Sequence, residues 1–202
     1  MKLKYILPCL ALTTGLLTLA CNNTSNERNQ HANQNQEHHD HAPQQEGSNQ
    51  STPGATPTTS NEVAKAIPAF TFYKVKSGIS YTNDDLQAGK NTVFILFDPS
   101  CSHCQNEAGA LGKNYDKIKD VNILYISMND PALMVNFFNT FGKELQDKPN
   151  VEMLYDRNQE FVQKIHIPSI FPANYVYGPD GKLKSSWEGE KNINEIIAEF
   201  VK

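Results

Sequence analysis

Apolar residues are spread unevenly along this chain of 202 residues. They form one block over residues 5–19 and return only after residue 62. Between Asn22 and Glu62 there is no Val, Ile, Leu, Met, Phe, Tyr or Trp, and Asn, Gln, Ser, Thr, Pro and His dominate instead. Such a stretch cannot bury enough apolar surface to offset the entropy lost on ordering. The pattern therefore predicts a disordered segment over 21–62 and one globular domain over 66–202.

Strands and helices are expected to alternate along the domain. Continuous apolar runs are typical of central strands that are buried on both faces, and apolar residues at helical spacing are typical of amphipathic helices. The predicted strands span residues 69–75, 79–81, 92–97, 121–128, 151–155, 175–177 and 183–187. The predicted helices span residues 101–118, 131–141, 159–166 and 192–201. This order indicates an α/β fold in which helices flank a central mixed β-sheet.

The first apolar block has the features of an export signal. A short basic start precedes the apolar run, which ends at Ala20 and Cys21. The run is too short to span a membrane, and a small residue at its end is typical of a signal cleavage site. We therefore expect residues 1–20 to be a signal peptide. The ending LTLAC at residues 17–21 is similar to the lipobox of bacterial lipoproteins, which makes Cys21 the expected lipidation site; the alternative is an ordinary cleaved signal that leaves Cys21 as a free thiol.

The predicted disordered segment carries a group of histidines. Four of the six histidines of the chain lie there, and they are His31, His38, His39 and His41. Imidazoles in a short tract can bind Zn²⁺ or Cu²⁺. A disordered tract has no preset coordination geometry, so we favour the interpretation that the segment is a polar tether.

The charge of the chain limits the class of partner. Without the two lysines of the predicted signal, 16 basic residues face 22 acidic residues, which gives a formal charge of −6. A negative domain is not expected to bind nucleic acid, because the phosphate backbone would repel it.

Cysteine usage points to one candidate site. Of the four cysteines, Cys9 lies in the predicted signal and Cys21 is the predicted anchor. The remaining pair, Cys101 and Cys104, forms a C-x-x-C motif between a predicted strand and a predicted helix. In an exported protein, such a pair is more often redox-active than structural.

The motif predicts a role for each cysteine. The N-terminus of a helix offers unpaired N–H groups and partial positive charge, which favour a thiolate at Cys101 and make it the attacking nucleophile. Cys104, one turn further on, is the expected resolving thiol that closes the Cys101–Cys104 disulfide. His103 would add a positive charge beside the thiolate and make the disulfide more oxidising. The alternative for His103 is a solvent-facing polar residue without a role.

The domain resembles the membrane-tethered extracytoplasmic thioredoxins of the TlpA/ResA kind over residues 67–202. The segment 68–72 (PAFTF) is similar to the opening P-x-F-x-L strand of that family, and 104–107 (CQNE) matches its C-x-x-E. The segment 172–177 (PANYVY), followed by 180–182 (DGK), is similar to the family's P-T-x-F-[LV]-[IV]-D-x-D-G-K segment. The resemblance implies a thioredoxin fold.

The resemblance also implies a docking site for substrate. Pro172 is expected to be a cis-proline that faces the disulfide, and Phe171 and Pro172 would form the ledge on which an extended substrate segment pairs. Pro168 is the competing candidate, but its spacing to Asp180 and Gly181 is four residues too long.

Two departures from the family bear on the chemistry. Thioredoxins place a buried acid six residues before the first cysteine, where this chain has Ile95. Asp98 or Glu107 would have to replace it as the internal proton acceptor. The residue before the second cysteine, commonly Pro, is His103 here.

These features predict a thiol–disulfide oxidoreductase of the bacterial periplasm or cell envelope. It would need no cofactor and would exchange disulfides with cysteine-containing exported proteins and with a membrane thiol donor or acceptor. The resemblance favours a reductant, for example in cytochrome c maturation, whereas His103 favours an oxidant. The alternative is a metal-handling lipoprotein that binds copper or zinc through the tether histidines, with Cys101 and Cys104 as ligands or as a structural disulfide. Peroxide reduction is disfavoured, because Pro99 lies too close to Cys101 for the peroxidatic P-x-x-x-[TS]-x-x-C motif.

Overall fold

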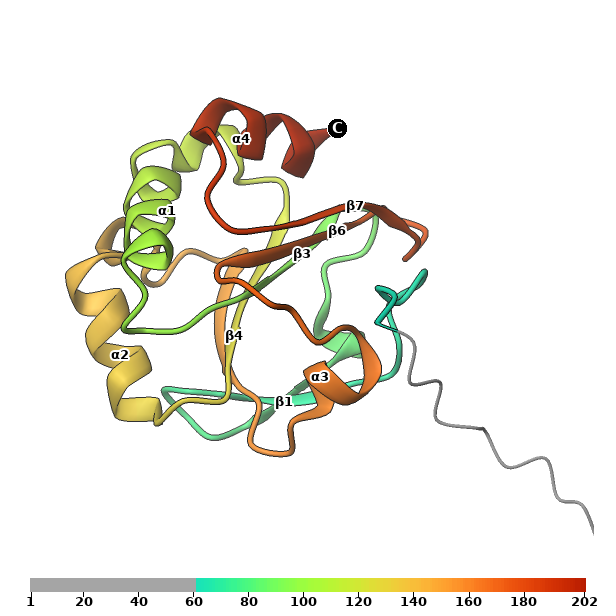
Figure 1. Ribbon diagram of the computed structural model, residues 1–202, viewed down its shortest axis with the longest axis horizontal. Coiled ribbons are helices and arrows are strands. Elements are labelled where there is room, and N and C mark those ends of the chain that lie inside the picture. Colours follow the sequence, from blue (N-terminus) through green and yellow to red (C-terminus); the bar gives the residue numbers. More distant parts are fainter. Residues whose placement is uncertain (1–60) are drawn as a thin grey trace, which may run out of the picture. The chain divides into compact units, whose positions relative to one another are not determined.

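The computed structural model describes residues 61–202, which Figure 1 shows in colour. The predicted signal peptide, the predicted lipidation site Cys21 and the predicted tether up to residue 60 lie outside the described residues. In the described part of the chain, no helix is long and apolar enough to cross a membrane. Contacts of the domain begin shortly before residue 66, since the Ala64 N–H donates to the Ile165 carbonyl at 2.9 Å.

A seven-stranded mixed sheet forms the centre of the domain, in the order β2-β1-β5-β4-β3-β6-β7. The strands are β1 (Thr71–Lys74), β2 (Ser80–Thr82), β3 (Thr92–Leu96), β4 (Asn122–Ser127), β5 (Val151–Tyr155), β6 (Ala173–Tyr177) and β7 (Leu183–Glu188). The three central strands β3, β4 and β5 run parallel, and β1 and β6 pair antiparallel at either side of them. Every residue of β3 and β4 is buried, which explains their unbroken apolar runs.

Within residues 61–202, four α-helices surround the sheet: α1 (Ser102–Lys113), α2 (Pro131–Thr140), α3 (Glu160–Lys164) and α4 (Ile193–Val201). Short 3₁₀ turns occupy Asn83–Asp85, Tyr115–Lys117 and Lys143–Leu145. The sequence specifies the start of α2, because the Asp130 carboxylate accepts a hydrogen bond from the Ala132 N–H at 2.7 Å and Pro131 takes the first helical position.

The α/β fold with a mixed sheet is confirmed, and the main differences lie at element ends. The first helix was expected to continue to residue 118, but α1 ends at Lys113. The Asn114 side chain donates to the Ala110 carbonyl at 2.9 Å, and a 3₁₀ turn follows. Ile118 is nevertheless fully buried, so the apolar spacing identified the buried face correctly while the local hydrogen bonds of Asn114 ended the helix.

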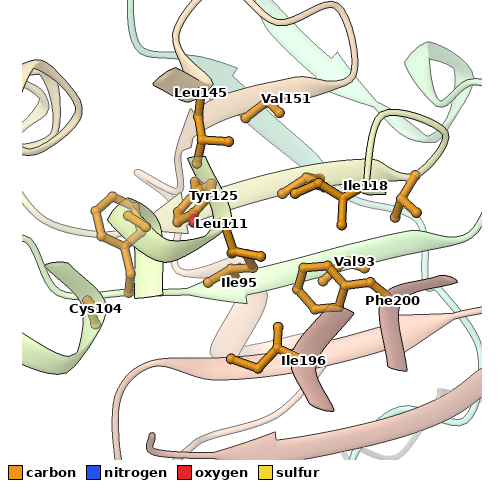
Figure 2. Packing of buried hydrophobic residues seen from close by; sticks show 14 of the residues in the cluster. Val93, Ile95, Cys104, Leu111, Ile118, Tyr125, Leu145, Val151, Ile196 and Phe200 are labelled. Atoms are coloured by element: carbon orange, nitrogen blue, oxygen red, sulfur yellow. The ribbon is translucent and has the colours of Figure 1, made fainter. Parts of the chain in front are cut away.

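The two faces of the sheet carry two separate cores. One core lies under α1, α2 and α4, and Figure 2 shows part of it, including Cys104, Ile95 and Tyr125. The other core is rich in aromatic rings and is completed by α3; its largest members are Phe72, Phe94, Phe161, Tyr175 and Tyr177. The cysteine motif belongs to the first face.

Candidate redox site

The cysteine motif lies where the chain leaves β3 and enters α1. Cys101 is the N-cap residue of α1, and its side chain makes no capping hydrogen bond. The first N–H groups of the helix therefore stay available to a negative sulfur at this end. Cys101 is half-buried, whereas Cys104 is buried at 1 % exposure, and both are free thiols. The two sulfurs are thus unlike in their access to solvent.

Cys104 is held in its thiol form. Burial is the main reason that its pKa lies well above the usual range, and a hydrogen bond with Cys101 adds to the rise. A hydrogen bond with the backbone of Asp98 acts in the opposite direction. Cys104 therefore needs a proton acceptor before it can attack as a thiolate.

Phe171 lies beside Cys101, although it is 70 residues further along the sequence. The Phe171–Pro172 peptide bond is cis, and Pro168 is not in a cis bond. The Cys101 Sγ lies 3.7 Å from the Phe171 carbonyl oxygen. Ile167 and Ile170, in the segment that leads to Phe171, are 63 % and 57 % exposed.

Of the two candidate proton acceptors, only Glu107 is buried. Asp98 lies in the exposed turn before α1, where its carboxylate accepts hydrogen bonds from the N–H and hydroxyl of Ser100. Glu107 is 6 % exposed and lies one helical turn after Cys104, on the same face of α1. Both of its carboxylate oxygens lie 3.2 Å from the Asn174 Nδ2 on β6. Burial raises the pKa of Glu107 from 4.5 to about 7, and the hydrogen bonds from Asn174 oppose that rise.

His103 faces away from the core. Its Nδ1 lies 2.9 Å from a carboxylate oxygen of Glu190, and both side chains are more than half exposed. The two residues line a pocket of about 250 Å³ between α1 and the segment that joins β7 to α4, and Glu107 also lines it. A protonated His103 would therefore have its charge offset by Glu190.

The family model described as "AhpC/TSA family" matches residues 63–186, which is more than half of the chain. The chain belongs to the AhpC/TSA family. Membership confirms the predicted redoxin relationship and supports the predicted enzyme class, a thiol oxidoreductase. No significant match was found among curated protein sequences.

Solved structures show the fold that this AhpC/TSA member shares. A secreted disulfide oxidoreductase of Mycobacterium tuberculosis, homologous to Escherichia coli DsbE, is 21 % identical with a TM-score of 0.54, over 65 % of this chain and 93 % of that one. Mycobacterium tuberculosis AhpC is 16 % identical with a TM-score of 0.54, over 69 % and 90 %. A SCO1/SenC family lipoprotein of Bacillus anthracis is 17 % identical with a TM-score of 0.52, over 67 % and 93 %. These similarities confirm the thioredoxin-like fold.

Metal ligation was the alternative use of the cysteine pair. Across residues 61–202, no three His, Cys, Asp or Glu side chains are grouped closely enough to hold a metal ion. The histidines of the tether lie outside the described residues.

Two residues of the site were not assigned from the sequence. They are Asn174, which lies in the segment that follows Pro172, and Glu190. An amide within the apolar run Ala173–Tyr177 is a usable signal, because a buried strand rarely contains asparagine unless its amide has a partner. Glu190 lies in an ordinary polar loop, and only the fold brings it to His103.

Proposed function

We propose that this protein is an exported thiol–disulfide oxidoreductase that exchanges disulfides through Cys101 and Cys104. One observation carries the proposal: an accessible thiol at a helix N-terminus and a buried thiol one turn later share a site with the Phe171 carbonyl. The difference in access fits two successive roles, attack by Cys101 and resolution by Cys104. The redox couple consists of the two sulfurs alone and needs no cofactor.

In the first step, the Cys101 thiolate attacks one sulfur of a substrate disulfide. A new bond forms between Cys101 and that sulfur, the substrate S–S bond breaks, and the second substrate sulfur leaves as a thiolate. The uncapped N–H groups at the start of α1 stabilise the negative charge on Cys101 before the attack. The hydrogen bond between Cys104 and Cys101 supports the same charge.

In the second step, Cys104 loses its proton to Glu107 and attacks Cys101. The Cys101–Cys104 disulfide forms, and the substrate sulfur leaves as a thiolate. Two electrons have then passed from the cysteine pair to the substrate, and the reverse sequence oxidises a substrate dithiol. Glu107 suits this role because it lies beside Cys104 and has a pKa of about 7, near the working pH of a general base.

The substrate would dock next to Cys101, on Phe171 and Pro172. Ile167 and Ile170 offer exposed apolar surface in the same segment. A cysteine in an extended segment with apolar neighbours fits such a surface, which matches the proposed partners, cysteine-containing exported proteins. A membrane thiol donor or acceptor would regenerate the pair.

The extracytoplasmic location is part of the proposal. It is supported by the N-terminal apolar block with its basic start and by the fold shared with a secreted oxidoreductase and with a lipoprotein. We propose that residues 1–20 are removed on export and that Cys21 carries the lipid that anchors the tether and the domain to a bacterial membrane.

Equilibration of the purified domain with glutathione and dithiothreitol buffers tests the function and its direction. A reversible two-electron transition at Cys101 and Cys104 is expected. Its reduction potential should be about −270 mV for a reductant and about −120 mV for an oxidant. The Cys104→Ser variant should accumulate a mixed disulfide with glutathione at Cys101, and the Cys101→Ser variant should not. A pair that stays reduced at every glutathione ratio would contradict the proposal.

A further inference from the structure

A row of four side chains, three of which carry a polar atom, crosses the sheet beneath α1. In the strand register, Ile95 of β3 pairs with Tyr125 of β4 on one side and with Asn174 of β6 on the other, and Asn174 pairs with Trp187 of β7. Residues paired in register place their side chains on the same face of a sheet. Figure 2 shows Ile95 and Tyr125 in one cluster with Cys104.

This row is poorly satisfied in its hydrogen bonding. Among residues 61–202, the Tyr125 hydroxyl, the Asn174 Oδ1 and the Trp187 Nε1 are buried atoms without a hydrogen-bond partner. Buried polar atoms are normally paired, and a group of unpaired ones in a native core calls for an explanation. Packing alone would favour apolar side chains at these positions, which makes the row a place to look for a functional task.

The side chain of Glu107 extends from α1 to this row and contacts Asn174. Within the described part of the chain, the Asn174 Nδ2 is the hydrogen-bond partner of both carboxylate oxygens. Asn174 itself is completely buried, so water does not compete for its amide. An N–H donor that contacts both oxygens stabilises the carboxylate over the acid and fixes the plane of the carboxyl group.

Ile95 occupies the place in this row at which the resembling thioredoxins carry their acid. Here the acid comes instead from α1, and the donor to its carboxylate comes from the neighbouring strand. We propose that Asn174 is a positioning residue for the redox reaction: its amide favours the ionised form of the Glu107 carboxyl group and aims it at Cys104. This inference rests on the proposed oxidoreductase function and adds the residue that sets the proton acceptor.

Other titratable groups also face Glu107. Cys104 lies on its own helix, and Tyr125 faces it from β4. Burial keeps the pKa of both of these groups well above the usual range, so neither is charged near neutral pH. Glu190, Lys191 and His103 lie around the pocket that Glu107 also lines, where water screens their charges.

The test follows the second step alone. The mixed disulfide between Cys101 and glutathione is formed with oxidised glutathione, and the release of glutathione by Cys104 is then followed from pH 5 to pH 9. In the wild-type domain, release should accelerate as Glu107 ionises. In Asn174→Leu, the midpoint of this profile should rise by about one pH unit or more, and release at pH 7 should fall by about fivefold or more. Attack of Cys101 on oxidised glutathione should keep its wild-type rate.

Two further variants separate positioning from a structural effect. Asn174→Ser places a small polar side chain at this position and serves as the second variant if Asn174→Leu fails to fold. It should shift the midpoint of the profile in the same direction. In a Glu107→Gln background, Asn174→Leu should cause no further loss of rate, because its effect passes through Glu107. Asn122→Ser, which alters another buried asparagine on β4, should lower stability and leave the midpoint unchanged.

The results distinguish the inference from the function on which it rests. If the wild-type Cys101 does not react with oxidised glutathione, the proposed function fails. If Cys101 reacts but the Asn174 variants give the wild-type midpoint, or if the losses from Glu107→Gln and Asn174→Leu add, the role of Asn174 is overturned and the function stands.

Discussion

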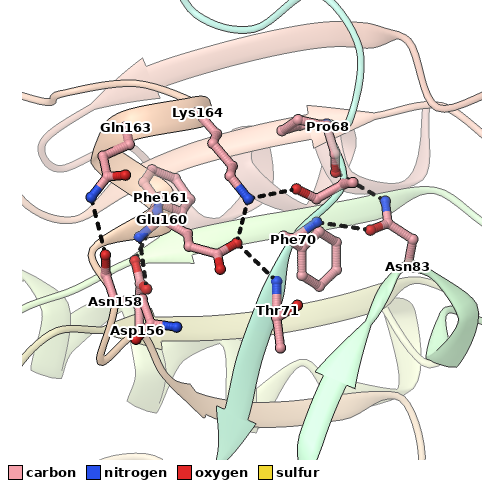
Figure 3. A network of polar contacts seen from close by, with 11 residues as sticks. Pro68, Phe70, Thr71, Asn83, Asp156, Asn158, Glu160, Phe161, Gln163 and Lys164 are labelled. Carbon is pink, nitrogen blue, oxygen red and sulfur yellow. Dashed lines mark hydrogen bonds and ion pairs between the residues drawn. The ribbon is translucent and has the colours of Figure 1, made fainter.

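Among residues 61–202, each face of the sheet buries one carboxylate, and the two carboxylates differ in their hydrogen-bond partners. On the face with the aromatic core, Asp156 is 1 % exposed and accepts hydrogen bonds from the N–H groups of Glu160 and Phe161 at 2.9 and 2.8 Å (Figure 3). On the other face, Glu107 is held by a single neutral side chain. Asp156 ties the start of α3 to the end of β5 through backbone N–H groups, whereas Glu107 contacts one side-chain amide on a strand 67 residues away.

The comparison shows that burial alone does not identify a functional acid. Burial raises the pKa of both groups. In Asp156, backbone hydrogen bonds oppose the rise and give the carboxylate a structural task. In Glu107, the hydrogen bonds from Asn174 offset only part of the rise in pKa, and the carboxyl group lies beside a thiol that must lose a proton. An under-compensated buried acid next to a reactive group is the stronger sign of catalysis.

The largest expected effect is a loss of stability on replacing Asp156, the structural acid of the pair. Asp156→Ala removes two charge-assisted hydrogen bonds and leaves two buried N–H groups unpaired, which should lower the free energy of unfolding by about 4 kcal/mol. Denaturant unfolding measures this loss. In the fraction that remains folded, release of glutathione by Cys104 should keep its wild-type rate. A selective loss of that rate would place Asp156 in the redox chemistry and end the distinction between the two acids.

Ionisation of the buried Glu107 should make the native state less stable as the pH rises. Its native pKa of about 7 exceeds the ordinary 4.5, so between these values the native state binds more protons than the unfolded state. Stability therefore falls as the pH rises through this window, by up to about 3 kcal/mol. Glu107→Gln should remove the fall and be more stable than the wild type at pH 8, while losing the second redox step. Unfolding of the reduced proteins at pH 4.5 and pH 8 measures the difference, and parallel curves for the two proteins would contradict it.

Two tyrosines allow a matched test of the faces. The Tyr175 hydroxyl lies 2.8 Å from the His166 Nδ1 on the aromatic face, whereas the Tyr125 hydroxyl has no partner among residues 61–202. Tyr175→Phe should cost about 1 kcal/mol, and Tyr125→Phe should be neutral or stabilising by a similar amount. Thermal unfolding of both variants measures the contrast. An equal loss in the two would mean that the polar row beneath α1 is as well satisfied as the aromatic face.

Patterns of local sequence were enough to predict most of the fold. The unbroken apolar runs of β3 and β4 and the Asp-Pro start of α2 all predicted elements that the structure contains. Helix ends were harder to predict from the sequence, because they depend on single hydrogen bonds such as that of the Asn114 side chain. The cysteine motif itself was visible because its spacing is short and its chemistry is carried by adjacent residues.

The surroundings of the motif could not be predicted in the same way. Glu107 and Asn174 are 67 residues apart, and their contact exists only because β6 lies next to β3 beneath α1. The pairing of His103 with Glu190 depends in the same way on where the loop before α4 lies. Sequence spacing within one element gives no information on such contacts, whereas a lone amide in a buried strand does point to a partner.

The smallest effect is expected from charge at the surface of the site. His103 and Glu190 are more than half exposed, and ion pairs of this kind contribute at most about 1 kcal/mol, which corresponds to less than about 30 mV for a two-electron couple. His103→Ala should lower the potential of the cysteine pair, because the positive charge that a protonated His103 places beside the thiolate is lost. Glu190→Gln should raise it, because the compensating carboxylate is removed. Equilibration with glutathione buffers measures both shifts, with Lys113→Ala at the far end of α1 as the unshifted control. A change of about 100 mV in either variant would show that exposed charge, rather than the buried acid beneath α1, dominates the energetics of the couple.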